Sequence, residues 1–144
     1  MDTGLFAIAF KTIFSLQGIL LIAAGVIIGI IAGIIPGLTS SVALGLLLPI
    51  TFVLPKELAY PMLLGIYCGA TYGGAIPAIL LNLPGTPTSA ITAIDGSPMT
   101  KQGRGAEALG IAVVGSTIGG LFSAAVLIFL SLRLSRVAFY FAGP

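Results

Sequence analysis

The sequence predicts an all-α integral membrane protein, with about four transmembrane or half-membrane helices that are interrupted by Pro-Gly breaks. The first observation is composition: 58% of the 144 residues are hydrophobic, only 7% are charged, and mean hydropathy is +1.19. The second is a set of apolar runs about as long as the hydrocarbon core of a bilayer is thick. The third is that Pro and Gly interrupt these runs twice, at residues 36–37 and 84–85. We expect residues 1–144 to form a single transmembrane region.

Charge and cysteine content exclude several classes of function. Six Lys and Arg against four Asp and Glu leave a net charge of +2, too few basic residues for a nucleic-acid surface. There is no His and one cysteine, Cys68, so a disulfide within the chain is impossible and a Cys/His metal site is excluded. An intramembrane enzyme is poorly supported, because there is no paired carboxylate and no Ser with an evident base.

The first apolar run predicts a transmembrane helix over residues 16–35, because about 20 residues at 1.5 Å each match the ~30 Å hydrocarbon core. Residues 1–14 precede it as a short amphipathic segment, which we expect at the membrane interface. The apolar run 12–35 is longer than the core of a signal peptide and lacks a small-x-small cleavage site, so we expect it to be retained. Glycine recurs at every fourth position from residue 25 to residue 37, which predicts a smooth face for another helix and favours packing over ligand contact for the first three: Gly25, Gly29, Gly33 and Gly37.

Pro36 and Gly37 end this helix, since Pro lacks a backbone donor and Gly adopts unusual turn dihedrals. Hydroxyl residues follow at once, including Thr39 and Ser40. They can cap a second, shorter helix predicted over 41–54. They can equally offer oxygens to a cation or donors to a carboxylate.

The third apolar segment, residues 58–83, carries Gly65, Gly69 and Gly73 four residues apart. Gly74 and Pro77 loosen its middle. Its polar members are spaced so that several could share one face: Tyr67, Thr71, Tyr72 and Asn82.

A second break at Pro84 and Gly85 repeats the first, because both breaks fit the pattern P-G-x-x-[S/T]-S. Its hydroxyl residues are Thr86, Thr88 and Ser89. Hydrocarbon offers no partner to unpaired backbone groups, so broken helices at membrane depth usually line a site, and paired breaks are a pointer to a transporter. The alternative is that Gly and Pro are simply commoner in membrane helices.

The remaining sequence predicts a turn at 95–98, a charged loop at 101–107 and a further transmembrane helix at 106–131. Gly115 and Gly119 form a packing pair in that helix.

If all four segments cross the membrane, the basic residues place the N-terminus in the cytoplasm. Lys11, Lys56, Arg133 and Arg136 then share one side, against Lys101 and Arg104. If the region around Pro36 is re-entrant, three basic residues lie on each side of the membrane, and the positive-inside rule then predicts no orientation.

Four stretches together resemble the large membrane subunit of the tripartite tricarboxylate transporters, the TctA family. They are IPGL at 35–38 with the apolar run to Pro49, GIYCGATYGG at 65–74, AILLNLPG at 78–85, and DGSPM at 95–99 followed by Gly103. The resemblance implies a multi-pass protein of the bacterial inner membrane, a secondary transporter driven by an ion gradient. It also implies three partners besides the lipid bilayer: a citrate-like carboxylate, a periplasmic substrate-binding protein and a small membrane subunit. Members of the family are several times longer, so we expect an N-terminal fragment.

On this hypothesis the substrate and ion site lies at the two breaks, and no further cofactor is expected. Hydroxyls and helix-start N–H groups would bind the carboxylates: Thr39, Ser40, Thr86, Thr88 and Ser89. Asn82, with carbonyls near Gly37 and Gly85, would ligate Na⁺ or respond to H⁺ as the coupling ion. The other candidate site residues are Pro36, Tyr72, Gly73 and Pro84.

The alternative hypothesis is a membrane assembly or scaffold protein that does not transport. In that case the glycine faces would dock partner helices and the breaks would only be kinks.

Overall fold

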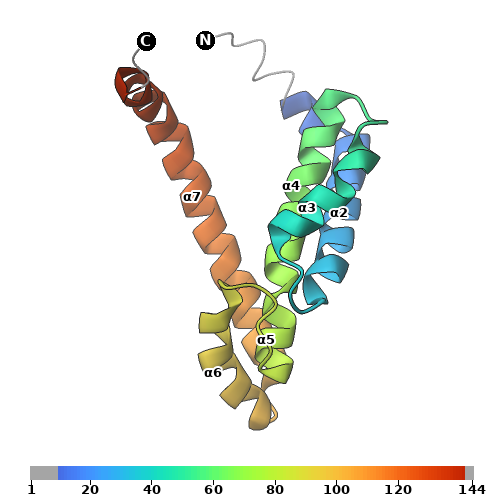
Figure 1. Ribbon diagram of the computed structural model, residues 1–144, viewed down its shortest axis with the longest axis vertical. Helices are drawn as coiled ribbons and strands as arrows, with labels where there is room; N and C mark the ends of the chain where they lie inside the picture. The colour runs from blue at the N-terminus through green and yellow to red at the C-terminus, as the bar shows by residue number, and fades with distance from the viewer. Residues whose placement is uncertain (1–9, 142–144) are drawn as a thin grey trace. The chain divides into compact units, whose positions relative to one another are not determined.

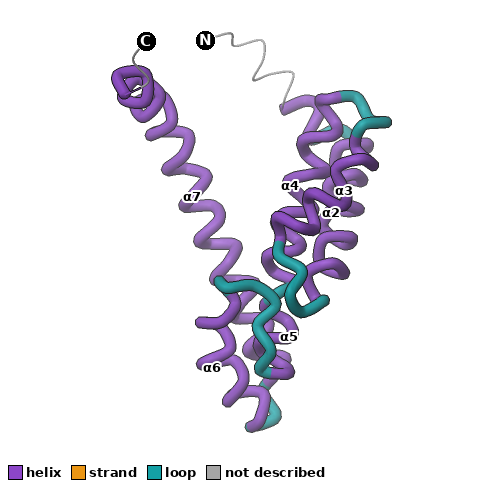
Figure 2. Tube along the Cα trace, viewed as in Figure 1, coloured by secondary structure: helices purple, strands orange, loops and turns teal. Residues whose placement is uncertain are grey.

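The computed structural model describes residues 10–141, with side chains for residues 10–130, and this part of the chain is helical with no strand (Figure 1, Figure 2). The predicted all-α class is therefore confirmed. The helices labelled in Figure 1 are α2 (Leu16–Ile34), α3 (Ser40–Thr51), α4 (Lys56–Gly73), α5 (Ala75–Leu81), α6 (Ser89–Lys101) and α7 (Gly105–Phe141). Of the predicted amphipathic segment, residues 1–9 lie outside the described residues and 10–13 are helical. The chain divides into two compact units, one ending at Leu109 and one beginning at Gly110.

Three spans in the described part of the chain are long and apolar enough to cross a membrane: Leu16–Ile34, Lys56–Leu81 and Gly105–Leu130. The second combines α4 with α5. α3 is also apolar but has 12 residues, which corresponds to about 18 Å and is shorter than the ~30 Å hydrocarbon core. The predicted set of transmembrane and half-membrane helices is confirmed, with α3 as the short one.

α2 and α4 pack with their backbones nearly in contact. A methyl group built on Gly25 would lie 2.5 Å from the Met62 carbonyl oxygen, and one on Gly65 would lie 2.7 Å from the Ile22 carbonyl oxygen. No side chain larger than hydrogen fits at either position. The predicted packing face is confirmed for Gly25, Gly29 and Gly33, whereas Gly37 lies in the turn after α2 with no neighbour within 4 Å of an added methyl group. The partner of this face is the second glycine row of the same chain: Gly65, Gly69 and Gly73.

The register of these contacts shows that α2 and α4 run in the same direction. Gly69 lies against Val26, and Gly73, one turn later, lies against Ile30. Residue numbers therefore increase together along the two helices. The start of α2 and the start of α4 consequently lie at the same edge of this helix pair.

α3 connects the end of α2 to the start of α4. Thr39 caps its first turn, with the hydroxyl oxygen accepting from the Val42 N–H at 3.4 Å. The next residue, Ser40, has its hydroxyl 2.9 Å from that of Thr71 near the C-terminal end of α4. α3 therefore starts where α4 ends, and its last residues lead into the start of α4.

Residues 35–38 form the turn between α2 and α3. The Leu38 N–H donates to the Ile35 carbonyl oxygen at 3.1 Å, and Gly37 has φ +87°. Pro at the second position and Gly with positive φ at the third are the requirements of a type II turn. The predicted Pro-Gly break is therefore confirmed as a true chain reversal.

A pair of alanine substitutions should change stability in opposite directions. Neither Gly37 nor Gly45 has a neighbour within 4 Å of an added methyl group, but only Gly37 has positive φ. We expect Gly37→Ala to lower the free energy of unfolding by about 1–2 kcal/mol. Gly45→Ala, inside α3, should raise it by about 1 kcal/mol. Equilibrium unfolding of the purified chain in detergent checks both, and a stabilising Gly37→Ala would contradict the turn assignment.

The predicted turn at 95–98 is wrong, because these residues lie inside α6. Pro98 is within the helix, and Gly96 is buried where an added methyl group would lie 2.7 Å from the Ile79 side chain. The Thr100 hydroxyl donates to the Ile79 carbonyl oxygen at 2.9 Å. Gly96 thus permits close packing of α6 on α5, a use of glycine that local sequence does not distinguish from a turn.

The end of α6 is closed by a Schellman motif. The Gly103 N–H donates to the Thr100 carbonyl oxygen and the Arg104 N–H to that of Met99, both at 2.9 Å, with φ +79° at Gly103. The loop predicted over 101–107 is therefore shorter than expected. α7 already begins at Gly105 and continues to Phe141, ten residues beyond the predicted helix end at 131.

Candidate functional site: the junction of two helix breaks

Both Pro-Gly breaks reach the same place, the C-terminal turn of α4. From the first break, the Ser40 hydroxyl lies 2.9 Å from the Thr71 hydroxyl. From the second, the Gly85 N–H donates to the Gly74 carbonyl oxygen at 3.3 Å. A methyl group on Gly85 would also lie 3.1 Å from the Gly33 carbonyl oxygen of α2. We call these five residues, Gly33, Ser40, Thr71, Gly74 and Gly85, the break junction.

Helix ends of both polarities meet at the break junction. α2 and α4 end there, and α3 begins there at Ser40. α6 begins close by, because Thr86, just before it, packs on Gly74 with 2.9 Å between the Thr86 methyl and an added Cβ. Helix N-termini carry roughly half a positive elementary charge and C-termini the opposite. The junction therefore offers partial charges for an anion and for a cation, although none of its five residues is ionisable.

The hydroxyls of the first break can be assigned by counting protons. The Thr71 hydroxyl donates to the Tyr67 carbonyl oxygen at 2.8 Å. A hydroxyl has one proton, so Ser40 must be the donor in the Ser40–Thr71 bond. Ser40 is then left with acceptor lone pairs, which suit a cation or a donor group.

The hydroxyls of the second break form a reciprocal cap. The Thr86 N–H donates to the Ser89 hydroxyl oxygen at 3.0 Å, and the Ser89 N–H donates to that of Thr86 at 3.3 Å. The Ser89 hydroxyl also donates to the Thr86 carbonyl oxygen at 2.7 Å. This exchange has the reciprocal bonding of a capping box, but it lies in the turn before α6, whose N-cap residue Thr88 makes no side-chain cap. Thr86 and Ser89 are both buried.

Thr88 adds a donor to this break. Its hydroxyl lies 3.0 Å from the Thr86 hydroxyl. The two hydroxyls carry two protons, and their shared bond uses one. The Thr86 and Thr88 pair therefore retains one proton that it can donate to a carboxylate oxygen.

The predicted site residues fall into two groups by burial. Five of them are buried near α4 or at the start of α6: Ser40, Gly73, Gly85, Thr86 and Ser89. The remainder are exposed or half-buried: Pro36, Gly37, Thr39, Tyr72, Asn82, Pro84 and Thr88.

Asn82 has a conformational role in the structure. It is the only described residue other than Gly with positive φ, at +58°, and it terminates α5 in the left-handed region. Asn tolerates this region better than other residues with a side chain. The Asn82 side chain is exposed.

The Tyr72 side chain reaches α7 and not the second break. Its hydroxyl donates to the Leu109 carbonyl oxygen at 3.5 Å. Tyr72 therefore links the end of α4 to the first turns of α7.

The sequence prediction of site residues omitted three members of the junction: Gly33, Thr71 and Gly74. Thr71 was recognisable as a hydroxyl in an apolar helix, eleven residues before Asn82 and next to Tyr72. Gly33 and Gly74 carried no local signal for a site, because their role depends on the approach of Gly85 from a later segment.

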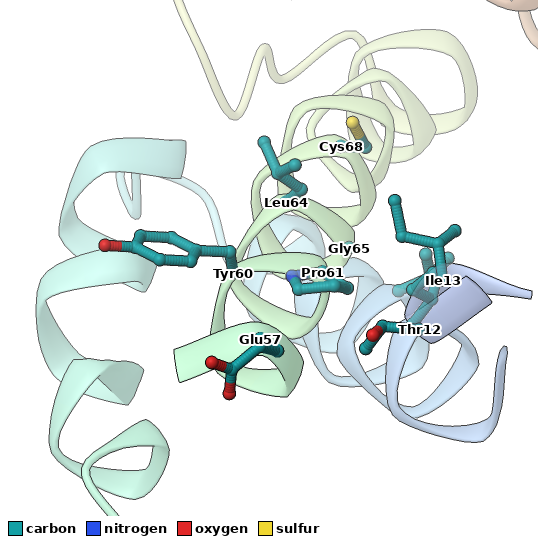
Figure 3. A pocket seen from close by; sticks show the side chains of 10 residues that line it. Thr12, Ile13, Glu57, Tyr60, Pro61, Leu64, Gly65 and Cys68 are labelled. Atoms are coloured by element: carbon teal, nitrogen blue, oxygen red, sulfur yellow. The ribbon is translucent and has the colours of Figure 1, made fainter. Parts of the chain in front are cut away.

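A cavity of about 660 Å³ lies toward the N-terminal end of α4, away from the break junction. Figure 3 shows its labelled residues, with Pro61 and Gly65 between Tyr60 on one side and Ile13 on the other. Its lining is mostly apolar, and its ionisable members include the acidic Glu57 and no Lys or Arg. A carboxylate would be repelled by Glu57 and would find few donors, so this cavity is not the carboxylate site.

Comparison with known proteins finds a family and a relative that this chain resembles. The model of the tripartite tricarboxylate transporter TctA family matches residues 19–144. A protein of Agrobacterium vitis, described as an uncharacterized 52.8 kDa protein in the TAR-I ttuC' 3' region, is 39% identical over 138 residues. That alignment covers 96% of this chain and 28% of the relative, so the chain spans little more than a quarter of the relative's length. No solved structure matches.

Proposed function

Since this chain belongs to the tripartite tricarboxylate transporter TctA family, we propose that it forms part of the membrane subunit of a secondary transporter. The transporter is driven by an ion gradient and carries tricarboxylates or related, citrate-like carboxylates. It lies in the bacterial inner membrane, receives substrate from a periplasmic binding protein, works with a small membrane subunit and catalyses no reaction. The observation that carries the proposal is the break junction, where two non-helical segments of a multi-pass protein meet.

The second break is proposed to bind the substrate carboxylates. The Thr86 and Thr88 pair has a proton to donate, and the start of α6 contributes positive partial charge. Two further proposed ligands lie at helix starts: Thr39 at the start of α3 and Ser89 at the start of α6. Neutral donors of this kind bind an anion without burying a formal charge, and they release it more readily.

The coupling cation is proposed to bind to oxygens of the junction. Ser40 offers lone pairs, and the carbonyls of Gly33 and Gly74 lie beside Gly85. Carbonyl and hydroxyl oxygens are ligands for Na⁺ in broken-helix transporters. Asn82 and the carbonyls near Gly37 complete this proposed set, with H⁺ as the alternative coupling ion.

The scaffold hypothesis loses support only from the glycine rows of α2 and α4, because Gly115 and Gly119 of α7 have nothing within 4 Å of an added methyl group. A scaffold would need a free glycine face to dock partner helices. The rows of α2 and α4 instead face each other, with Gly29 against Ile66 and Gly69 against Val26.

Uptake kinetics test the carboxylate site. In a full-length family member that carries these residues, Thr88→Ala should raise the KM for labelled citrate about tenfold, because one hydrogen bond to a charged group is lost. Thr117→Ala is the matched control, since that hydroxyl already donates to the Val113 carbonyl oxygen within α7. An unchanged KM in Thr88→Ala would remove this hydroxyl from the site. If the assembled protein binds no carboxylate at all, the scaffold function is favoured instead.

A further inference from the structure

Two adjoining cavities lie at the edge where α2 and α4 begin. The larger, of about 660 Å³, lies between α4 and the start of the described chain, and the smaller, of about 400 Å³, lies next to it. They share two lining residues, Thr12 and Glu57, so they adjoin, and we call the two cavities together the groove. Neither cavity includes a residue of the break junction.

The larger cavity is mostly apolar, and the α4 residues that line it span about half the thickness of the hydrocarbon core. Along α4 it extends from Glu57 to Cys68, and Figure 3 labels both residues around it. Eleven residue steps correspond to about 16 Å at 1.5 Å per residue. Half of the ~30 Å hydrocarbon core is about 15 Å. A cavity of this volume is also within the usual range of small-molecule sites, about 300–1,000 Å³.

The smaller cavity is lined in part by residues of opposite charge. Lys11 and Glu57 both line it, together with the amide of Gln17. Within the described residues, the ion pair found is that of Arg104 and Glu107, and neither Lys11 nor Glu57 takes part in it. Because α2 and α4 run in the same direction, this cavity lies at the membrane–water boundary when the two helices cross the bilayer.

We propose that this groove is a binding site for a zwitterionic phospholipid of the phosphatidylethanolamine type. One acyl chain occupies the apolar cavity between the N-terminal segment and α4. The phosphate lies near Lys11 and the ammonium near Glu57. The mostly apolar cavity, whose α4 lining spans about half the hydrocarbon core, suits the acyl chain. The adjoining cavity, with one positive and one negative side chain, suits the zwitterionic head group. The inference does not depend on the transport proposal.

Lipid titration of the purified chain in detergent, followed by native mass spectrometry, tests the proposal. Phosphatidylethanolamine should bind more tightly than phosphatidylglycerol, whose net negative head is repelled by Glu57. Lys11→Gln and Glu57→Gln should each weaken phosphatidylethanolamine binding about fivefold. Lys56→Gln is the matched control, because Lys56 begins α4 at the same edge but lines neither cavity. Equal affinities in all three variants, or equal affinity for the two lipids, would overturn the proposal.

Cys68 provides a second measurement that requires no substitution. It is exposed and lines the deep end of the groove. Bound phosphatidylethanolamine should slow its alkylation severalfold, whereas phosphatidylglycerol at the same concentration should not. An alkylation rate that phosphatidylethanolamine leaves unchanged contradicts the site. Efficient Cys68–Cys68 crosslinking that persists with the lipid present would show that a second copy of the chain fills the groove.

Discussion

Replacing Gly29 by Leu is expected to separate α2 from α4 and to lower the free energy of unfolding by about 3 kcal/mol or more. Gly29 is buried against the backbone of Ile66 and Ala70, which cannot move aside as a flexible side chain would. In a bilayer, helix association depends on this close packing, because lipid tails are as apolar as the side chains.

The measurement is equilibrium unfolding of the purified chain in mixed SDS and detergent micelles, followed by circular dichroism. Gly45→Leu is the matched control, since nothing lies within 4 Å of an added methyl group at that exposed position of α3. Amide hydrogen exchange should also accelerate in α2 and α4 of the Gly29 variant. Equal stability of the two variants would show that the glycine rows do not determine helix pairing.

Replacing Gly85 by Val is expected to reduce citrate uptake about 100-fold in a full-length family member that carries this sequence. The added side chain would begin 3.0 Å from the Gly74 Cα and 3.1 Å from the Gly33 carbonyl oxygen. It would push the second break away from α4 and move the proposed ligands Thr86 and Thr88 with it. Misplacement of binding groups by about 1 Å is enough for a loss of this size.

Gly45→Val is the matched control for Gly85→Val, because nothing lies within 4 Å of an added methyl group at that exposed position of α3. Both variants should first be compared for their amount in the membrane and their helix content. A Gly85→Val protein that is folded, present at normal amounts and fully active would contradict a role for the break junction in transport. Loss of uptake together with loss of the folded protein would be resolved by the smaller change Gly85→Ala, which should give an intermediate uptake rate.

Most of the fold follows from local rules that the sequence displays directly. The apolar runs define the spans, because a bilayer core of fixed thickness requires helices of a fixed minimum length. The type II turn at Pro36 and Gly37 follows from proline and glycine dihedral preferences alone. The prediction of a turn at 95–98 failed because it used local sequence alone. Gly96 permits packing of α6 on Ile79, a residue distant in sequence.

The candidate site was predicted only in part, for a similar reason. Ser40 and Gly85 are recognisable because each follows a break. Thr71 lies in α4 and Gly74 at its end. They belong to the candidate site only because Ser40, after the first break, contacts Thr71 and Gly85, in the second break, contacts Gly74. Asn82 is predicted as a ligand because it is a polar amide in an apolar segment. The structure gives another reason for Asn at this position, because Asn82 ends α5 in the left-handed conformation.

By itself, the sequence determined the class of the protein, its spans, its two breaks and its glycine rows, because each depends on composition or on spacing along the chain. Only the tertiary structure decided that the two glycine rows face each other and that both breaks meet at the end of α4. The physical reason is that the sequence of one glycine row does not show which other helix backbone the row will contact. This contact arises where two segments approach more closely than any side chain would allow.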